Sequence, residues 1–333
     1  MKAFLLERYG RKRALRLADV PVPALRDDEV LVEVHAAGVN QLDAKLRDGA
    51  FKLVIPYRLP ITLGHDVAGI VTQVGPRATR FKVGDEVYAR LDDFRIGGFA
   101  EYAPVKEASL AHKPRGLSME QAASLPLVAL TAWQALVEKT RLKAGEKVFI
   151  QAGSGGVGTI AIQLAKHLGA IVATTTSAGN AALVSELGAD VIIDYRSQDI
   201  ADVLHEYDVV LHSQDNPTLM KSLGVLKPGG RLVSISGPPD LEFGRVVAAP
   251  LFVRGVMRLM SAGVRRKARQ ARVDYTFLFM RADGAQLREI TSLVDAGFIR
   301  PVIDRVFPFG ATNEALAHVD SGRARGKVVI TVR

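Results

Sequence analysis

The chain has 333 residues, of which 48% are hydrophobic, a length sufficient for two domains with cores of their own. It contains no cysteine, which excludes disulfides, a thiolate nucleophile and any zinc site built from cysteine. The formal net charge of +9 is compatible with an acidic partner and does not require one. The charged N-terminal segment is unlike a secretory signal, and no stretch approaches the ~20 apolar residues of a membrane span, so we expect a cytoplasmic protein.

The N-terminal third of the chain carries the pattern of short β-strands. The segments KAFLLE, VLVEVHAAGV, DVAGIVTQVG and GDEVYARL are separated by glycine and other turn residues. Such alternating segments are typical of a small β-rich barrel. We predict a domain of this kind over residues 1–123.

A different periodicity begins at about residue 124. Helical stretches such as NAALVSELGA alternate with the apolar runs VFIQA, IVATTT, VIIDY, VVLHS and RLVSIS, and YTFLFM is a candidate sixth strand. Parallel strands need crossover connections, so this alternation predicts a doubly wound parallel α/β sheet over residues 124–280. Residues 281–333 return to mixed helix and strand, and we expect them to complete the first domain.

A glycine-rich turn links the first of these strands to a helix. The segment KVFIQAGSGGVG places Gly153, Gly155 and Gly158 in GxGxxG spacing. Gly153 permits the tight turn, Gly155 lets the backbone approach a pyrophosphate, and Gly158 lets the helix pack close to the sheet. The N–H groups at the helix N-terminus then face the phosphates. We predict a dinucleotide site formed by Gly153, Ser154, Gly155, Gly156, Val157 and Gly158.

A basic segment follows the fifth strand. Positions 254–272 hold seven Lys or Arg and no acidic residue. A basic run on a helix is most often a solvated face. The pattern leaves open the more specific alternative that this segment contacts RNA or an anionic membrane surface.

Taken in order, seven segments resemble the medium-chain dehydrogenase/reductase superfamily, and within it the zinc-independent quinone oxidoreductase and enone reductase branch. They are AAGVNQLDAKLRDG, GHDVAGIVTQVG, FKVGDEVYA, GGFAEYA, AASLPLVALTAWQAL, AGSGGVG and GRARGKVVI. The resemblance implies a GroES-like catalytic domain made of residues 1–123 and 281–333, a Rossmann NADP(H)-binding domain over residues 124–280, and a homodimer.

The resemblance also bears on metal binding. Where zinc alcohol dehydrogenases of this superfamily carry their Cys, His and Cys ligands, this chain matches Asn40, His65 and Leu127. One imidazole is too few to hold a catalytic zinc ion. We therefore expect no metal, a packing or hydrogen-bonding role for His65, and a structural role for Asp66.

NADPH is the cofactor that the resemblance implies. NAD-preferring Rossmann folds place an acidic residue at the end of the second strand, and that position falls at Thr175. Thr175 and Ser177 can donate hydrogen bonds to a 2'-phosphate, although the chain has Asn180 where NADP-using relatives commonly carry a lysine. The further candidates for contacts with this phosphate are Tyr195, Arg196, Arg323 and Lys327.

Without metal or thiol, reduction depends on the placement of the hydride donor and on polar groups near the reacting carbonyl. The resemblance matches Asn40 to the zinc-ligand position and Thr131 to a threonine near the nicotinamide, and the Tyr57 phenol can donate to a carbonyl oxygen. Hydride transfer to the β-carbon of a conjugated carbonyl spreads charge to oxygen, whereas a simple ketone gives a full alkoxide, which relatives stabilise with zinc. We therefore predict an NADPH-dependent reductase of quinones or α,β-unsaturated carbonyls.

One loop departs from the family pattern. The segment DVVLHSQDNP places His212, Asp215 and Asn216 where relatives usually carry Asp and glycines beside the nicotinamide ribose. Polar bulk there predicts an unusual substrate or a weak activity. His212 could titrate near neutral pH, although a settled hydrogen-bonding role fits better. Two other functions stay open: an RNA-binding protein that keeps the nucleotide fold, and a redox-sensing or assembly partner with residual turnover.

Overall fold

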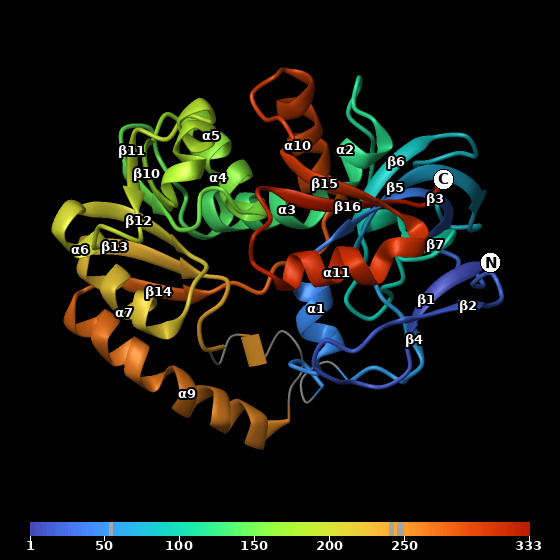
Figure 1. Ribbon diagram of the computed structural model, residues 1–333, viewed down its shortest axis with the longest axis horizontal. Helices are drawn as coiled ribbons and strands as arrows, with labels where there is room; N and C mark the ends of the chain where they lie inside the picture. Colours follow the sequence, from blue (N-terminus) through green and yellow to red (C-terminus); the bar gives the residue numbers. More distant parts are fainter. Residues whose placement is uncertain (53–55, 240–242, 245–249) are drawn as a thin grey trace. The chain divides into compact units, whose positions relative to one another are not determined.

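The computed structural model describes residues 1–52, 56–239, 243–244 and 250–333 (Figure 1). The chain divides into two compact units. Unit 1 comprises Met1–Leu130 and Arg281–Arg333, and unit 2 comprises Thr131–Met280. The first limit lies inside a helix, a few residues beyond the predicted boundary at 123/124, and the second falls at 280/281. The assignment of these ranges as domains stays a prediction.

Unit 2 is built on a six-stranded parallel sheet with the strand order β11-β10-β9-β12-β13-β14. The predicted parallel sheet is confirmed, and YTFLFM supplies its sixth strand. The direction of the strand order reverses between β9 and β12, so the carboxyl ends of these two strands flank a topological switch point. The strands are β9 (Lys147–Ile150), β10 (Ile171–Thr176), β11 (Val191–Asp194), β12 (Tyr207–His212), β13 (Leu226–Ser234) and β14 (Asp274–Phe277).

Helices connect these strands and cover the sheet (Figure 1). They are α4 (Gly156–His167), α5 (Ala181–Glu186), α6 (Ile200–Val203), α7 (Asn216–Gly224) and α9 (Leu251–Gln270). Before β9 come α3 (Pro126–Trp133) and a π-helix, Gln134–Lys139, that extends it. Helices α4 and α5 pack on β9, β10 and β11. Apolar side chains of α6, α7 and α9 share one buried core with Phe149, Val210 and Leu232 of the sheet.

Unit 1 contains a seven-stranded sheet of order β15-β16-β3-β5-β6-β8, in which β7 also pairs with β3, and a three-stranded sheet of order β2-β1-β4. The C-terminal strand β16 pairs antiparallel with β3, so the two ends of the chain contribute to one sheet. The strands are β1 (Lys2–Leu6), β2 (Arg16–Asp19), β3 (Glu29–Val39), β4 (Ile61–Thr62), β5 (Asp66–Val74), β6 (Glu86–Arg90), β7 (Tyr102–Lys106), β8 (Leu110–His112), β15 (Ile303–Pro308) and β16 (Lys327–Thr331). The helices are α1 (Gln41–Arg47), α2 (Met119–Ala123), α10 (Gly284–Asp295) and α11 (Thr312–Asp320).

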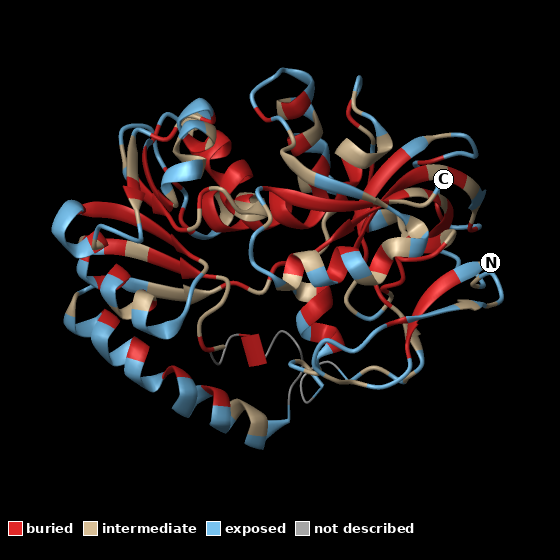
Figure 2. Cartoon of the chain, viewed as in Figure 1, coloured by how far each residue is buried: buried red, intermediate tan, exposed pale blue. Residues whose placement is uncertain are grey.

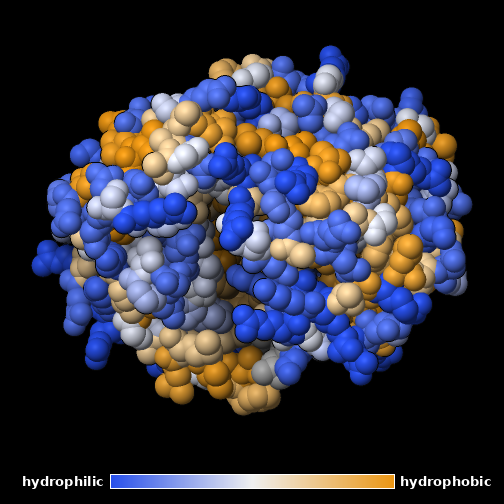
Figure 3. All heavy atoms as spheres, in the orientation of Figure 1, coloured by the Kyte–Doolittle hydropathy of each residue, from blue (hydrophilic) through white to orange (hydrophobic). Residues whose placement is uncertain are grey.

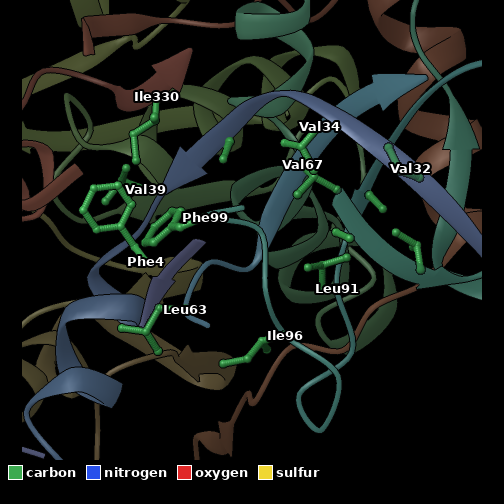
Figure 4. Close-up of a cluster of buried hydrophobic side chains, with 14 of the residues drawn as sticks. Phe4, Val32, Val34, Val39, Leu63, Val67, Leu91, Ile96, Phe99 and Ile330 are labelled. Atoms are coloured by element: carbon green, nitrogen blue, oxygen red, sulfur yellow. The ribbon is translucent and has the colours of Figure 1, made fainter. Parts of the chain in front are cut away.

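The core of unit 1 holds the end of β3 in place. Phe4, Val39, Phe99 and Ile330 gather in this core, from segments far apart in the chain (Figure 4). Buried residues gather in the inner strands of both large sheets, while exposed residues gather in the loops and on the outer faces of the helices (Figure 2). The edge strands β14 and β15 contain no buried residue. Since Val39 is the last residue of β3, the core fixes the position of the polar residue that follows it.

Candidate functional site

The glycine-rich turn of unit 2 lies at the carboxyl end of β9, beside the switch point. A Cβ atom on Gly153 would lie 2.2 Å from the hydroxyl oxygen of Thr174, and one on Gly158 would lie 2.3 Å from the carbonyl oxygen of Ala152. A Cβ atom on Gly155 would meet only the Ala152 oxygen, at 3.3 Å. Two glycines therefore allow close packing inside the protein, while the third leaves space for a ligand beside the backbone.

The turn differs from the prediction in one respect. We predict Gly153 as the residue whose freedom permits the tight turn, but the positive φ, 52°, belongs to Ala152. The Ala152 amide donates to the Thr175 hydroxyl at 3.1 Å and the Gly153 amide donates to the Thr175 carbonyl at 2.9 Å. Position 153 needs glycine because any side chain would collide with Thr174.

Helix α4 begins directly after this turn, with Gly155 as its N-cap. The first N–H groups of a helix have no acceptor within the helix, and its dipole favours negative charge at this end. Ser154, Gly156 and Val157 are partly exposed beside them. The turn is thus an open cradle of N–H donors, whose chemistry fits a diphosphate.

Side-chain hydroxyl groups gather next to the turn, at the carboxyl end of β10. Thr176 donates to the Ser154 hydroxyl at 3.0 Å, and the Asn180 amide donates to the hydroxyls of Ser154 at 3.2 Å and Ser177 at 3.3 Å. The carbonyl oxygen of the Asn180 side chain is buried and has no hydrogen-bond partner in the described part of the chain. None of these four side chains is acidic, and Asn180 orders the hydroxyls instead of supplying a charge.

Tyr195 and Arg196 follow β11, the strand next to β10. The Tyr195 amide donates to the Thr176 carbonyl at 3.3 Å, which places both residues at the edge where the hydroxyls lie. The Tyr195 ring is exposed, and the Arg196 guanidinium carbon lies 5.8 Å from its centroid. An exposed cation and an aromatic ring are therefore available to a phosphate at this edge.

The loop after β12 lies on the other side of the switch point. The His212 ring is buried; its Nε2 donates to the Gln214 carbonyl at 3.0 Å, and its Nδ1 has no partner among the described residues. Burial lowers the pKa of His212 to about 4, so the ring is neutral at neutral pH. The burial of the His212 ring and its bond to Gln214 therefore support the hydrogen-bonding role over titration near neutral pH. Asp215 caps α7 by accepting from the Thr218 amide at 3.0 Å.

Unit 1 contains a buried polar cluster at the end of β3. Asn40 follows this strand and caps α1, and its backbone N–H donates to the Asp43 carboxylate at 2.9 Å. The Asn40 side-chain amide donates to Asp66 at 2.9 Å, and its carbonyl oxygen accepts from the Lys327 ammonium. Asn40 and Lys327 are each 5% exposed, and the two carboxylates are fully buried. Asn40 is therefore held at both ends of its side-chain amide.

Lys327, a candidate for the 2'-phosphate, is placed in this cluster. Its ammonium donates to the Val39 carbonyl at 3.2 Å, to Asn40 and to Asp66 at 3.3 Å, which uses all three of its hydrogens. Burial raises the pKa of Asp66, and the Lys327 charge and the Asn40 hydrogen bond act in the opposite direction. A contact between Lys327 and a 2'-phosphate would require this buried ion pair to break.

The same cluster contains a histidine–carboxylate pair. His65 Nδ1 lies 2.6 Å from an Asp43 carboxylate oxygen, and Asp66 accepts from the Leu127 amide at 2.9 Å. These contacts agree with the hydrogen-bonding role expected of His65 and the structural role expected of Asp66. Across the described ranges, no three His, Cys, Asp or Glu side chains are placed to hold a metal ion.

The two other predicted catalytic residues lie in different units. The Tyr57 hydroxyl donates to the backbone carbonyl of Asp93, and burial together with the Asp93 carboxylate raises the pKa of Tyr57. Tyr57 would have to leave this acceptor to donate to a substrate. Thr131 is buried in α3 and is the first residue of unit 2. The candidate groups therefore fall into two sets, with Asn40 and Tyr57 in unit 1 and Thr131 with the glycine turn in unit 2.

Sequence reasoning missed the Asp66–Lys327 ion pair. The two residues are 261 positions apart, so no periodic pattern links them. The available signal was weak: each is a charged residue followed by a run of apolar residues, in β5 or in β16.

Comparisons with known proteins relate both units to one family. A model of the alcohol dehydrogenase GroES-like domain matches residues 26–115, and a model named zinc-binding dehydrogenase matches residues 187–330. The chain is 36% identical over 357 residues to the NAD(P)H oxidoreductase RTN4IP1, mitochondrial, of Mus musculus, covering 100% of this chain and 89% of the relative. It is 34% identical over 344 residues to the NADPH-dependent alkenal/one oxidoreductase, chloroplastic, of Arabidopsis thaliana, covering 99% and 79%.

The fold is also that of solved structures. The quinone oxidoreductase from Coxiella burnetii matches with a TM-score of 0.87 at 31% identity, and the match covers 100% of this chain and 99% of the other. The predicted fold class, a GroES-like β-rich domain with a doubly wound Rossmann domain, is confirmed. None of the described helices has the length and apolarity to cross a membrane. The two relatives above are named mitochondrial and chloroplastic, so they lend no support to the predicted cytoplasmic location.

Proposed function

Because the chain belongs to the medium-chain dehydrogenase/reductase superfamily, in its quinone oxidoreductase and enone reductase branch, we propose that it reduces quinones or α,β-unsaturated carbonyls with NADPH. Membership makes the chain an oxidoreductase that uses a nicotinamide cofactor. The choice of NADPH, the substrate class and a mechanism without zinc are the steps of the proposal.

The hydroxyl cluster at the end of β10 carries the choice of NADPH. Thr175 occupies the strand-end position where a carboxylate would bind the ribose hydroxyls of NAD. Ser154 and Ser177 lie beside it, ordered by Asn180, and the exposed Arg196 follows the neighbouring strand. A 2'-phosphate would be repelled by a carboxylate, whereas hydroxyls and a guanidinium can bind it.

The cluster of unit 1 supports a role for Asn40 at the reacting carbonyl. When bound at the glycine turn, NADPH supplies the hydride, so the protein's task is positioning and polarisation. Asp66 and Lys327 fix the orientation of the Asn40 amide. Its second N–H has only a long contact, 3.4 Å, with the Gly38 carbonyl, and in the proposal it donates to the substrate carbonyl or a cofactor hydroxyl.

In this proposal the protein does not need a strong acid to protonate the reduced substrate. Hydride addition to the β-carbon leaves charge that is shared with oxygen, so water or the Tyr57 hydroxyl can supply the proton. Thr131, in unit 2, is proposed to lie near the nicotinamide. Neither residue has to act as a strong acid.

The position of Lys327 supports a mechanism without zinc. Its ammonium is bonded to Asn40 and Asp66, which match or adjoin the positions of zinc ligands in metal-dependent relatives. A zinc ion held there would stand beside a buried positive charge, which is unfavourable in a medium of low dielectric constant. The cluster is therefore better suited to hold an asparagine amide than a divalent cation.

The proposed activity is tested by following NADPH oxidation against a quinone, a conjugated enone and the matching saturated ketone. We expect turnover with the first two and none with the ketone. Activity confined to the saturated ketone would refute the proposed chemistry. Tight NADPH binding without turnover on any of the three would favour the redox-sensing or assembly partner instead.

The cofactor choice has its own test in Thr175→Asp, with Thr175→Asn as the matched uncharged control. A carboxylate at this position should weaken NADPH binding at least about tenfold, or ~1.4 kcal/mol, and leave NADH binding equal or stronger. The asparagine variant should lose much less NADPH affinity, because its side-chain oxygen can still accept from the Ala152 amide and it adds no charge. Equal losses for NADPH and NADH in Thr175→Asp would contradict the proposed phosphate site.

We also propose, from the resemblance alone, that the chain forms a homodimer. Sedimentation velocity of the purified chain tests this proposal. A monomer at micromolar concentration would contradict it.

A further inference from the structure

Helix α9 uses only one of its faces to hold itself on unit 2. Met257, Ser261, Val264 and Ala268 are buried, at the three- and four-residue spacing of a single helical face. Val264 and Ala268 belong to the core that also contains residues of the parallel sheet. The basic segment singled out in the sequence therefore lies on a packed helix whose other faces point away from that core.

The outward face of the N-terminal half of α9 is apolar. Phe252, Val256 and Leu259 repeat at spacings of four and three, so they lie on one face, and Leu251 and Met260 flank them. Their exposed fractions are 75%, 51% and 77% for the first three and 83% and 59% for the flanking pair. The space-filling view shows apolar side chains gathered at the lower edge of the molecule, over α9 (Figure 3). We call these five residues the apolar stripe.

Basic residues lie beside the apolar stripe and follow it along α9. Helix α9 contains six Lys or Arg and no acidic residue, against a formal net charge of +9 for the whole chain. Five of the six are exposed and have no ion-pair partner among the residues that the structure describes: Arg258, Arg265, Arg266, Lys267 and Arg269. Unpaired cations next to exposed Phe, Leu and Met side chains are the chemistry of a helix that lies in the interface of a bilayer.

We propose that α9 docks this protein peripherally on an anionic membrane surface, with the apolar stripe inserted between lipid headgroups and the cations on lipid phosphates. Charge complementarity favours this occupant over a second copy of the chain. A symmetric dimer through this face would place two sets of like charges against each other. RNA would satisfy the cations but would leave the apolar stripe exposed. An anionic bilayer satisfies both features at once.

Cosedimentation of the full chain with vesicles tests the proposal, without any measurement of turnover. We expect at least about tenfold tighter binding to vesicles of equal parts phosphatidylcholine and phosphatidylglycerol than to phosphatidylcholine alone, weakening as salt is raised. The double variant Phe252→Ser, Leu259→Ser should lose about tenfold or more of this affinity. The triple variant Arg265→Gln, Arg266→Gln, Lys267→Gln should lose a similar factor and its salt dependence.

Matched controls separate this helix from the general charge and apolarity of the surface. Val22→Ser with Val83→Ser removes two exposed apolar residues of unit 1, and Arg11→Gln, Lys12→Gln, Arg13→Gln removes three exposed cations there. Both control variants should bind anionic vesicles like the original chain. All the positions are exposed, and far-UV circular dichroism checks that each variant is folded.

Three results would overturn the proposal. The first is an equal loss of vesicle binding in the control and the α9 variants. The second is no vesicle binding, with a dimer in sedimentation velocity that the double variant Phe252→Ser, Leu259→Ser converts to monomer. The third is no vesicle binding, with salt-dependent binding of a single-stranded RNA oligonucleotide that only the triple Gln variant loses.

Discussion

Replacing Lys327 by methionine tests the buried cluster of unit 1. The methionine still fills the space of the lysine stem, but the fully buried Asp66 is left as a carboxylate without the ammonium that lies 3.3 Å away. Removing one partner of a buried ion pair costs about 3–5 kcal/mol. We therefore expect the free energy of opening of unit 1 to fall by about this amount at neutral pH.

Hydrogen exchange followed by mass spectrometry measures this fall in the free energy of opening in the full chain. Amides of β3 and β16 report the opening of unit 1, and amides of β9 and β12 report the opening of unit 2. Exchange should accelerate in the first pair of strands and stay near its original rate in the second. Lys166→Met is the matched control, because Lys166 pairs with Asp190 at 2.9 Å on the exposed surface and should contribute less than about 1 kcal/mol.

The pH dependence of the Lys327→Met effect has a definite sign. Burial raises the pKa of Asp66 in the folded state, so the ionised carboxylate destabilises the fold above that pKa. The penalty disappears below the unfolded pKa of about 3.9. The loss of stability should therefore shrink as the pH falls, and adding Asp66→Asn should recover part of it at neutral pH. A loss no larger than that of Lys166→Met, or one that grows as the pH falls, would refute the reasoning.

Three further predictions concern the turn, the loop after β12 and the candidate proton donor. Gly158→Ala should destabilise unit 2 and abolish NADPH binding, because the new Cβ atom would lie 2.3 Å from a backbone oxygen. Gly155→Ala should change the free energy of unfolding by less than about 1 kcal/mol and still weaken NADPH binding. Equal losses of stability for the two variants in a denaturation experiment would contradict this. Burial lowers the pKa of His212 to about 4, so the ring is neutral in both the folded and the unfolded chain above pH ~6.5 and does not affect stability there. As the pH falls from ~6.5 to about 4, the unfolded chain gains a proton that the buried ring resists, and the free energy of unfolding should fall by on the order of 3 kcal/mol. NMR titration of the ring nitrogens should show a neutral ring at pH ~6, and a charged one would contradict the burial argument. Tyr57→Phe should lower kcat with an enone less than about tenfold, because water can supply the proton; a loss of about a thousandfold would make Tyr57 the essential donor.

The architecture was accessible from the sequence because local patterns encode it. Strands buried on both faces appear as continuous apolar runs, and the alternation with helical segments is enough to predict the parallel sheet of unit 2. The glycine turn was found for a similar reason, since its three glycines follow a strand and open a helix. Even there, the positive φ of Ala152 depends on bonds to Thr175, on another strand, and no local pattern shows them.

The site was less accessible, because side chains from distant parts of the chain complete it. Lys327 stands at the start of a short strand near the C-terminus, where a lysine is typical of an exposed strand end, so its burial beside Asp66 could not be read from its surroundings. The Tyr57 hydroxyl is likewise bonded to a carbonyl 36 residues away. The resemblance marked Asn40 as a candidate by its match to a zinc-ligand position, but it did not show the two partners that hold the Asn40 amide.

The measurement that bears most directly on the proposed function is the destination of the transferred hydride in protein whose zinc content has been determined. NADPH deuterated at the reactive ring position is supplied with a conjugated enone, and the product is examined by NMR. Metal-free protein should place deuterium on the β-carbon of a saturated ketone. Deuterium on the carbonyl carbon of an alcohol, or turnover only in protein carrying stoichiometric zinc, would contradict the account.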